Sequence, residues 1–572
     1  MAPVDHESER NLDIDRILNS SSPRKIVVAG PGTGKSYLFG KLIKQKRKAG
    51  KINCLAVTFI GKLSDALADE LCGLAKTTTM HGFARGLVMQ HHPNWSYYPQ
   101  IYDLIAQDLG KEGIKTFAIG DETYLRKTQY YRAVGDKDVV HYAVQICKEK
   151  PQNIPVYDLV LVDEYQDFNQ VESELVDLLA QKNEMVIVGD DDQALYTFKG
   201  SSPSFIRRKF AASNTDWESF TLRFCSRCTE IIIKYFHSLV AHFNLNNPHE
   251  PDVARKRIEK DYICYLSQKS GGRDYDSKAN PFIHLLKNYP PPMIAHRIKF
   301  YLEELVKSQK VKEVLVVGEA QRCAPLLEQI AQQLQGFGFS SVTFGVSEDI
   351  VPIRPNIIEA YKYIAKDKSS LLGWRILGNP SEEVRPGHIK KAETLCTLTE
   401  GTPSTHAKIK ESDILQLELE IEDWRSRAAK IDVGAVGCDE NKPEGERREQ
   451  NEEIRRKVLI QKLKTRSQYL QRPLGNLDIT VCNVLKSKGL GADVVFIVGF
   501  DEGKFPAKTK ATESEIYQML VAVTRAKKKL YLINTAGSAV SSFVECLDHK
   551  DLSLDEFKPA KPKPAQPRHR VG

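Results

Sequence analysis

A glycine-rich stretch near the N-terminus has the residue types and spacing of a phosphate-binding loop. The apolar run KIVVAG (25–30) continues into AGPGTGKS (29–36), with glycines at 30, 32 and 34. Such glycines let backbone N–H groups turn inward around phosphate oxygens, and a helix beginning behind the loop offers its N-terminal dipole to the same anion. Lys35 would reach the β and γ phosphates, and the Ser36 hydroxyl would bind Mg²⁺. The predicted nucleotide-binding residues here are Ala29, Gly30, Pro31, Gly32, Thr33, Gly34, Lys35 and Ser36.

Two adjacent carboxylates follow another apolar run further along the chain. The stretch DLVLVDEYQDF (158–168) places Asp163 and Glu164 at the end of a predicted strand. Beside a phosphate loop, the first carboxylate can hold Mg²⁺ through water, and the second can act as the base for an attacking water. Two acids at a strand end are common by themselves, so the two motifs together carry the prediction. The predicted metal ligands are Ser36 and Asp163.

Three consecutive aspartates stand in VGDDDQALYTFKG (188–200). Adjacent carboxylates suggest a metal site, whereas Tyr196 and Phe198 beside Lys199 suggest a surface that touches something flat and negatively charged. The stretch lacks the glycine and the distal glutamate of a calcium loop, and the Mg²⁺ ligands are already assigned. We therefore expect the aspartates to cap and brace the turn that follows a strand.

The apolar runs of the chain predict an α/β fold. Each run has four to seven residues rich in Val, Ile and Leu, and stretches with helical spacing flank it, which is typical of buried parallel strands in doubly wound sheets. Two clusters of runs, far apart in sequence, indicate two such sheets. The runs lie at 25–30, 54–59, 158–164, 185–190, 314–319, 494–500 and 529–534.

Composition limits the class of protein. With 41% hydrophobic and 27% charged residues, the 572-residue chain has an ordinary globular composition, and its net charge of +8 is compatible with nucleic acid without requiring it. The start of the sequence, MAPVDHESERNLDIDR, lacks the apolar core of a secretory signal, and no apolar run approaches the roughly 18 residues needed to span a bilayer. The 11 cysteines fit reduced thiols better than a disulfide framework. We expect a cytoplasmic protein with no membrane partner.

The motifs, in order, resemble those of the UvrD/Rep-type superfamily 1 DNA helicases. DEYQD (163–167) is similar to motif II of that family, and VGDDDQALYTFKG is similar to motif III. Six further stretches resemble family motifs and carry the similarity from about residue 25 to 534. They are LAVTFIGKLSDALADEL (55–71), TTMHGF (78–83), LRFCSRC (222–228), VLVVGEAQRCAPLLEQI (314–330), LKSKGLGADVVFIVGFDEGKFP (485–506) and LVAVTRAKKKLYLI (520–533).

The resemblance implies roles for individual residues. Lys35, Asp163 and Glu164 would keep the catalytic roles given above. Gln193 would sense the γ-phosphate, Arg227 and Arg525 would act as arginine fingers, and Gly489 would contact the nucleotide. Arg525 could instead be a surface cation on a basic helix, Phe59 a core residue and His81 a structural histidine. The residues implied to bind DNA are Thr58, Phe59, Thr79, His81, Tyr196, Phe198 and Lys199.

The resemblance also implies a domain organisation. Two RecA-like domains of the P-loop NTPase class, 1A and 2A, would each be interrupted by a mainly helical insertion. Domain 1A would comprise residues 1–84 and 152–221, with insertion 1B at 85–151. Domain 2A would comprise residues 222–350 and 475–550, with insertion 2B at 351–474. The basic, proline-rich tail, residues 551–572, is expected to be disordered.

Several positions depart from the family pattern, and the first two described here concern recognition of the nucleobase. The family's glutamine upstream of the phosphate loop is missing from NLDIDRILNSSSPRK (11–25), and Ser226 replaces the aromatic residue before the motif IV arginine. Ala29, Leu485 and Gly491 also differ from the usual residues, as does Phe198, which replaces a tryptophan. We therefore expect relaxed discrimination between nucleobases.

The resemblance implies ATP and Mg²⁺ as cofactors and a 3′-to-5′ DNA helicase or translocase acting in DNA repair, recombination or phage defence. Its partner would be single-stranded DNA or a 3′-tailed duplex, with a nuclease or another protein as a further partner. One alternative is a DNA-activated ATPase sensor or regulatory subunit of a nuclease complex. Another is a DNA-binding scaffold without motor activity.

Overall fold

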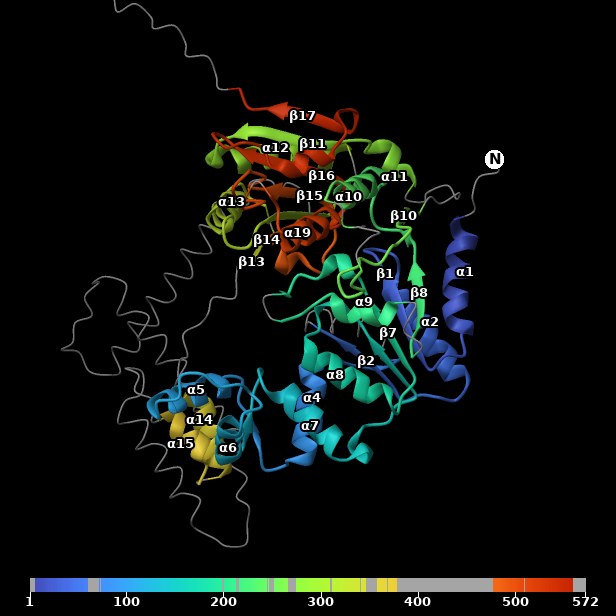
Figure 1. Ribbon diagram of the computed structural model, residues 1–572. Coiled ribbons are helices and arrows are strands. Elements are labelled where there is room, and N and C mark those ends of the chain that lie inside the picture. Colours follow the sequence, from blue (N-terminus) through green and yellow to red (C-terminus); the bar gives the residue numbers. More distant parts are fainter. Residues whose placement is uncertain are drawn as a thin grey trace, which may run out of the picture. The chain divides into compact units, whose positions relative to one another are not determined.

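The computed structural model describes two compact units of the chain (Figure 1). The first lies within residues 1–80, 154–347 and 467–572, and the second within 81–153 and 348–466. The description covers residues 6–59, 71, 74–197, 200–211, 216–243, 245, 251–265, 274–308, 311–339, 341–345, 357–367, 369–377, 477–508 and 510–558.

The first unit contains a six-stranded sheet in which every neighbouring pair is parallel, with strand order β3-β2-β6-β7-β1-β8. Its central strands are short and buried, apart from the half-buried Arg24 at the start of β1, as expected for a sheet with helices on both faces. The strands are β1 (Arg24–Ala29), β2 (Cys54–Thr58), β3 (Lys76–Thr79), β6 (Leu159–Val162), β7 (Met185–Gly189) and β8 (Glu218–Leu222).

The order of these strands brings the predicted motifs together. β7 pairs with β1 on one side and with β6 on the other, and β6 also pairs with β2. Because all four strands are parallel, their carboxyl ends lie at one edge of the sheet. The phosphate loop, Asp163, Asp190 and Phe59 follow these four ends directly.

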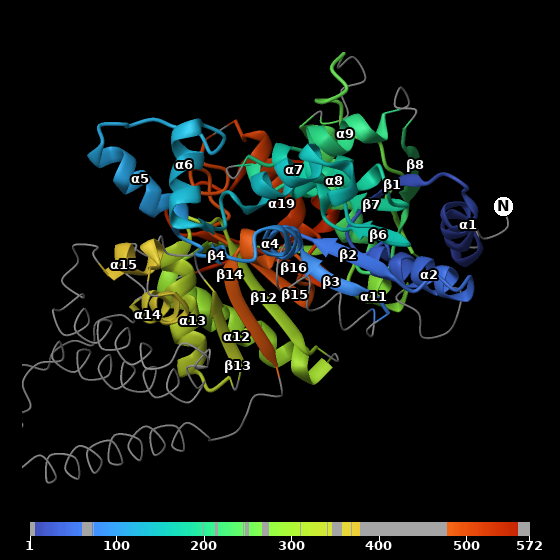
Figure 2. The same cartoon turned by 90° about the horizontal axis from the view of Figure 1, so that it is seen from below.

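Helices cover this sheet. Ile14 and Ile17 of α1 (His6–Asn19) and Leu38 and Phe39 of α2 (Lys35–Lys48) share one core with β1, β2, β6 and β7. Figure 2 shows α2 and α8 (Gln170–Ala180) on opposite sides of the sheet. A capping box starts α8, in which the Asn169 side chain accepts from the Glu172 N–H and the Glu172 carboxylate accepts from the Asn169 N–H. The short helix α9 (Ser204–Phe210) precedes β8.

A second, seven-stranded sheet in the same unit is also parallel throughout, with order β13-β14-β12-β15-β16-β11-β17. Parallel strands of this kind place successive side chains on opposite faces. In β12, Leu315 and Val317 belong to one core, while Val314 and Val316 belong to another. The strands are β11 (Ile283–Tyr289), β12 (Glu313–Gly318), β13 (Ser341–Gly345), β14 (Asp478–Asn483), β15 (Ala492–Val498), β16 (Ala526–Thr535) and β17 (Leu552–Glu556).

Each face of the second sheet packs on its own pair of helices (Figure 1). The helices α10 (Glu230–His242) and α19 (Glu513–Val523) contribute to one core, and α12 (Pro291–Ser308) and α13 (Ala324–Gly336) contribute to the other. Both sheets are therefore doubly wound, which confirms the predicted α/β fold class. A small ribbon of β9 (Phe224–Cys225) and β10 (Ile263–Cys264) lies in the connection between α9 and β11.

All seven predicted strands are present, but the prediction missed several others. The missed strands β3 (KTTT) and β8 (ESFTL) are polar, and β11 (IHLLKNY) mixes apolar residues with His284, Lys287 and Asn288. The predicted disordered tail is wrong at its start, because β17 forms the edge of the sheet and pairs with β11 from Ile283↔Leu552 to Lys287↔Glu556. The proline-rich part, 559–572, lies outside the described residues.

The second unit is mainly helical, within residues close to those predicted for the two insertions. Its core joins the described part of predicted insertion 2B to predicted insertion 1B through side chains such as Tyr98, Tyr124 and Tyr361. Arg375 donates to Asp108 at 2.6 Å, and the Tyr363 hydroxyl donates to the Tyr97 carbonyl at 2.8 Å. The helices are α4 (Met80–His91), α5 (Ile101–Lys111), α6 (Glu122–Tyr131), α7 (Val139–Glu149), α14 (Ile357–Lys366) and α15 (Leu371–Leu377), with strands β4 (Ser96–Tyr97) and β5 (Ala133–Val134).

No helix among the described residues has the length and apolar character needed to cross a membrane. Residues 351–356, 368 and 378–474 of predicted insertion 2B lie outside the described part of the chain.

Candidate nucleotide-binding site

The phosphate loop between β1 and α2 requires glycine for two reasons. Gly32 and Gly34 have φ values of 72° and 95°, in the left-handed region that side chains disfavour. A Cβ on Gly32 would also lie 2.3 Å from Cβ of Arg227, and one on Gly30 would lie 2.7 Å from the Tyr262 ring. The Thr33 hydroxyl donates to the Gly30 carbonyl at 2.8 Å and closes the loop. The loop thus has the shape predicted for it, although Ala29 ends β1 as a buried strand residue.

Lys35, the first residue of α2, points to the carboxylates after β6. Its Nζ lies 2.9 Å from Oε1 of Glu164, and both side chains are largely buried. Glu164 itself has the left-handed backbone conformation with φ 53°, an uncommon state for a residue with a side chain. Gln166 holds the second carboxylate oxygen, because its Nε2 donates to Oε2 of Glu164 at 2.6 Å. The structure therefore brings Lys35, Asp163 and Glu164 together as predicted.

Lys488, in the turn before β15, is a site residue that the sequence interpretation missed. Its ammonium pairs with Asp167 and lies 3.4 Å from Oε2 of Glu164, and it donates to the Gln193 carbonyl at 2.8 Å. The residue is buried. The predicted neighbour Gly489 is exposed in the same turn, with φ 82°, and does not line the cavity described below. The sequence offered one clue to Lys488, which is its position directly before Gly489, a residue already predicted to contact the nucleotide.

The carboxylates of Asp163 and Glu164 differ in pKa. Burial raises the pKa of Asp163 to about 6, and the charge of Glu164 acts in the same direction. Burial also acts to raise the pKa of Glu164, but the charges of Lys35 and Lys488 outweigh it and hold that pKa well below its usual range. Glu164 is therefore an ionised acceptor, positioned by two ammonium groups that come from different sheets.

Arg525 follows α19 and is almost completely buried. Nη2 of Arg525 donates to Oε1 of Gln193 at 3.0 Å, and Nε2 of Gln193 donates to Oδ2 of Asp190 at 2.6 Å. The remaining acceptors of Arg525 among the described residues are the Val521 and Leu490 carbonyls and the Thr524 hydroxyl. Burial and the nearby charge of Arg227 lower the pKa of Arg525 to about 10. Arg525 is therefore no surface cation, and two buried or half-buried guanidinium groups favour an anionic ligand beside them.

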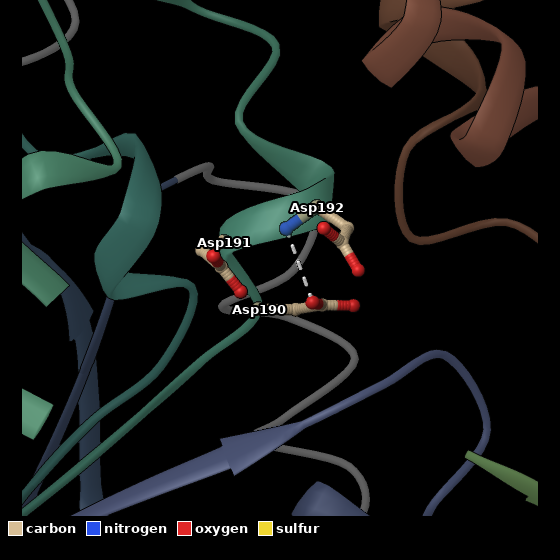
Figure 3. Close-up of side chains that lie close together, drawn as sticks. All are labelled: Asp190, Asp191 and Asp192. Carbon is tan, nitrogen blue, oxygen red and sulfur yellow. Dashed lines mark hydrogen bonds between the residues drawn. The ribbon is translucent and has the colours of Figure 1, made fainter. Parts of the chain in front are cut away.

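The three aspartates lie on one short turn after β7 (Figure 3). One oxygen of each lies within 4.8 Å of the others, close enough for a shared cation. The cation present is the ammonium of Lys260, at 2.5 Å from Asp190, 2.7 Å from Asp191 and 2.7 Å from Asp192. Asp190 also caps the turn by accepting from the Asp192 N–H at 3.2 Å.

Two arginines complete this buried ionic cluster. Arg257 binds Asp192 with Nε and Nη2, each at 2.6 Å, and Arg207 donates from Nε to Asp191 at 2.9 Å. Three carboxylates thus face three cations, so the cluster is neutral without a metal ion. Its cations come from the segment 251–262 and from α9, which the sequence interpretation did not associate with the aspartates.

The segment 251–262 also reaches the phosphate loop. Tyr262 packs its ring against Gly30 and donates from its hydroxyl to the Pro31 carbonyl at 2.6 Å. Ile258 donates its N–H to Asp191 at 3.0 Å. This segment, between α10 and β10, therefore connects the aspartate turn with the loop that would bind phosphate.

A cavity of about 590 Å³ opens beside the phosphate loop. Lys35, Ser36 and Arg227 line it together with Gly32 and Gly34. The cationic lining suits the phosphates of ATP, and the hydroxyl of Ser36 with the carboxylate of Asp163 offers the oxygen ligands that Mg²⁺ prefers. The residues present thus fit both ATP and Mg²⁺. Gly491 lies near Arg227 as well, because a Cβ there would be 3.5 Å from Nε of Arg227.

The residues predicted to bind DNA are only partly described. Thr58 and Thr79 pair at the carboxyl ends of β2 and β3, and the buried Oγ1 of Thr58 has no hydrogen-bond partner among the described atoms. Phe59 is half-buried and contacts the Tyr196 ring at 5.2 Å between centroids. His81 is the second residue of α4, and the boundary between the two compact units precedes it. Phe198 and Lys199 lie outside the described residues.

Two protein-family models match the chain. An "AAA domain" model matches residues 16–199, and a "UvrD-like helicase C-terminal domain" model matches residues 439–537. The first range contains the phosphate loop, Asp163 and Gln193, and the second contains Lys488 and Arg525.

Several curated proteins are similar to this chain. A probable DNA helicase II homolog of Mycoplasma capricolum is 22% identical over 488 residues, which cover 78% of this chain and 64% of the relative. The ATP-dependent DNA helicase PcrA of Staphylococcus epidermidis is 23% identical over 465 residues, 72% of this chain and 60% of the relative. An ATP-dependent helicase/nuclease subunit of Lactococcus lactis is 30% identical over 118 residues, 20% of this chain and 9% of the relative.

The chain spans less than two thirds of the length of each of these relatives. The two family models nevertheless match in the order in which the site residues occur, and the longer similarities cover most of the chain. This chain belongs to the UvrD/Rep-like family of superfamily 1 helicases.

Proposed function

We propose that this protein hydrolyses ATP and uses the energy to move along single-stranded DNA and unwind duplex DNA in the 3′-to-5′ direction. One observation carries the proposal: the site draws residues from both sheets. Lys488 precedes β15 of the second sheet and lies beside Glu164, which follows β6 of the first. Arg525 follows α19, which packs on the second sheet, and donates to Gln193, which follows β7 of the first. A nucleotide bound between such groups biases their arrangement, and its hydrolysis can move one sheet relative to the other. The polarity is the one that the family resemblance implies.

The residues present can each be given a part in hydrolysis. Mg²⁺, when bound, neutralises charge on phosphate oxygens, and Ser36 and Asp163 are the residues that would hold it. Lys35 binds the phosphates when it leaves Glu164, and Glu164 then accepts or orients the proton of the attacking water. Arg227 and Arg525 stabilise the charge that develops on the transferred phosphoryl group, an effect worth about 10³–10⁵ in rate elsewhere.

The proposed DNA contacts follow from residues at the ends of β2, β3 and the aspartate turn. Thr58, Thr79 and His81 would hold the phosphodiester backbone, with Lys199 as a further cation. Tyr196, Phe198 and Phe59 would stack on bases, each worth about 1–3 kcal/mol. Gln193 lies three residues before Tyr196, so a short turn would join the nucleotide to the DNA.

A second candidate is a DNA-activated ATPase that works beside a nuclease, as a regulatory partner, and does not unwind DNA. The similarity to the helicase/nuclease protein of Lactococcus lactis favours it, although that similarity covers a fifth of this chain. Repair, recombination and phage defence are the settings that we propose for either candidate.

Three measurements on the same preparation separate the candidates. ATP hydrolysis is measured with and without single-stranded DNA. Translocation is measured as displacement of streptavidin from biotin at the 5′ or the 3′ end of an oligonucleotide, and unwinding is measured on duplexes with a 3′ or a 5′ tail. Glu164→Gln serves as the inactive control because it keeps the size and hydrogen-bonding capacity of the side chain.

The proposed function requires DNA-stimulated hydrolysis, displacement from the 5′ end and unwinding of the 3′-tailed duplex. Stimulated hydrolysis without displacement or unwinding would favour the regulatory role. A rate of hydrolysis that is the same with and without DNA would reject both candidates. Displacement of streptavidin from the 3′ end would show that the polarity is opposite to the one proposed.

A further inference from the structure

The cavity beside the phosphate loop extends to side chains of α1 and α2 that phosphate binding does not explain. Its described lining contains six cationic residues and no carboxylate. Tyr37, directly after Ser36, also lines the cavity, and this residue is 48% exposed. The cationic residues are Arg10, Lys35, Lys41, Lys44, Arg227 and Lys527.

The Arg10 guanidinium lies near two aromatic rings at this wall of the cavity. The Arg10 guanidinium lies 5.6 Å from the Tyr37 ring centroid and 5.4 Å from the Tyr265 ring centroid. Both rings are therefore close enough to interact with the guanidinium. Nε of Arg10 is buried without a hydrogen-bond partner among the described residues, which leaves this donor unsatisfied.

The position of Arg10 is fixed by its surroundings. α1 is anchored through Ile14 and Ile17 in the core and through Asp13, which accepts from Nε of Arg223 at 3.0 Å. Nη2 of Arg10 comes within 3.1 Å of the place that a Cβ on Gly34 would take. The guanidinium therefore lies against the phosphate loop itself, at the distance where a nucleotide attached to that loop can reach it.

We propose that Arg10 and Tyr37 form the nucleobase subsite, and that this subsite accepts guanine at least as readily as adenine. The inference rests on the proposed nucleotide hydrolysis. Tyr37 offers a ring face on which any purine can stack. Arg10 has only donors, and guanine presents two adjacent acceptors, O6 and N7, whereas adenine pairs its N7 acceptor with an N6 donor. Arg10 and Tyr37 thus take the place of the glutamine and the aromatic residue missing from the family pattern.

The test compares KM and kcat for ATP, GTP, CTP and UTP in the 572-residue chain with DNA present. Arg10→Ala is expected to raise KM for GTP about tenfold and KM for ATP less, since a bidentate pair to guanine is worth about 1–3 kcal/mol elsewhere. Tyr37→Ala is expected to raise KM for both purines about tenfold, and Tyr37→Phe, which keeps the ring, is expected to bind them better than Tyr37→Ala. The variants should change KM rather than kcat, because Arg10 and Tyr37 act away from the reacting phosphate.

Matched controls come from exposed residues of the same types. Arg16→Ala lies on α1, with 72% of the side chain exposed, and Tyr130→Ala removes a tyrosine that is 56% exposed in the second unit. Inorganic tripolyphosphate, which has no base, serves as the competitor. It is expected to inhibit Arg10→Ala and wild type with the same inhibition constant.

The outcomes separate this inference from the proposed function. If wild type hydrolyses no nucleotide and does not bind tripolyphosphate, the proposed function fails first. If hydrolysis is normal and the Arg10 and Tyr37 variants match their controls, the nucleobase subsite is rejected alone. A wild type strictly selective for ATP rejects the preference assigned to Arg10. Weaker tripolyphosphate inhibition of Arg10→Ala would make Arg10 a phosphate ligand and overturn the assignment.

Discussion

Nη2 of Arg525 and Oε1 of Gln193 lie 3.0 Å apart, although Arg525 follows a helix of the second sheet and Gln193 follows a strand of the first. Gln193 in turn donates to Asp190, which is bound by Lys260. Arg525 is thus connected to the ionic cluster through one glutamine. We therefore propose that Gln193 transmits the state of the nucleotide.

Gln193→Ala is expected to remove most of the stimulation of ATP hydrolysis by DNA. The alanine leaves Arg525 without its side-chain acceptor in the first sheet, so the arginine loses its orientation toward the nucleotide. We expect a fall in DNA-stimulated kcat of about 10²-fold, the lower range for loss of one positioned transition-state donor. Steady-state hydrolysis at saturating DNA measures it. An unchanged ratio of stimulated to unstimulated rate would contradict the role.

Glu164→Gln is expected to lower kcat by about 10²–10⁴-fold, because the amide cannot accept the proton of the attacking water. Nucleotide binding should persist, since Lys35 is then freed from its ion pair and can bind phosphate. Single-turnover hydrolysis and binding of a fluorescent ATP analogue measure the two effects. Lys35→Ala is the comparison variant, and it should lose binding as well as turnover.

Lys488→Met is expected to shift the acid limb of the pH–rate profile to higher pH. Lys488 and Lys35 together hold the pKa of Glu164 below its usual range, so removal of one charge raises that pKa and protonates the carboxylate at a higher pH. Lys488→Arg keeps the charge and provides the comparison. A profile of Lys488→Met that superposes on the wild-type profile would exclude this electrostatic role.

Lys260→Met is expected to destabilise the protein by about 3–5 kcal/mol, because it leaves buried carboxylates without one of their cations. Urea denaturation followed by circular dichroism measures the change. Lys256→Met, an exposed lysine of the same segment, should leave the stability nearly unchanged. Equal stability of the two variants would show that the ion pairs of Lys260 do not hold the cluster together.

His284 is expected to make the stability of the protein depend on pH. The residue stacks on Tyr531 with 4.6 Å between ring centroids, and burial together with the charge of Lys529 lowers its pKa to about 4 from the usual 6.5. The unfolded chain therefore takes up the proton first as pH falls. The free energy of unfolding should decrease between about pH 6.5 and pH 4, by up to about 3 kcal/mol. His284→Phe should flatten this part of the stability profile in urea denaturation.

Much of the fold was predictable because buried parallel strands have a distinctive composition. The runs around Val27, Leu161, Ile187 and Phe496 contain little besides β-branched and other apolar residues, and each became a central strand. Edge strands are half-exposed and carry no such signature. For this reason KTTT of β3 and the tail strand β17 could not be distinguished from loop by composition.

The chemistry of the phosphate loop was determined by the sequence itself. Contiguous residues supply its glycines, its lysine and its hydroxyl, so the loop needs only the strand before it and the helix behind it. The same is true of Asp163 and Glu164 at the end of a strand. Local sequence suffices where one short segment provides every group of a motif.

The partners of those motifs were decided only by the tertiary structure. Lys260 lies 70 positions after Asp190, and Lys488 lies 321 positions after Asp167, so no spacing in the sequence associates them. The sequence favoured a capping role over a metal for the three aspartates, but it did not reveal their cations, because a sequence shows which acids are adjacent and not which cations the fold buries beside them. Burial removes the competing water, and this makes the ion pairs of the folded chain, rather than its composition, decide what each carboxylate can bind.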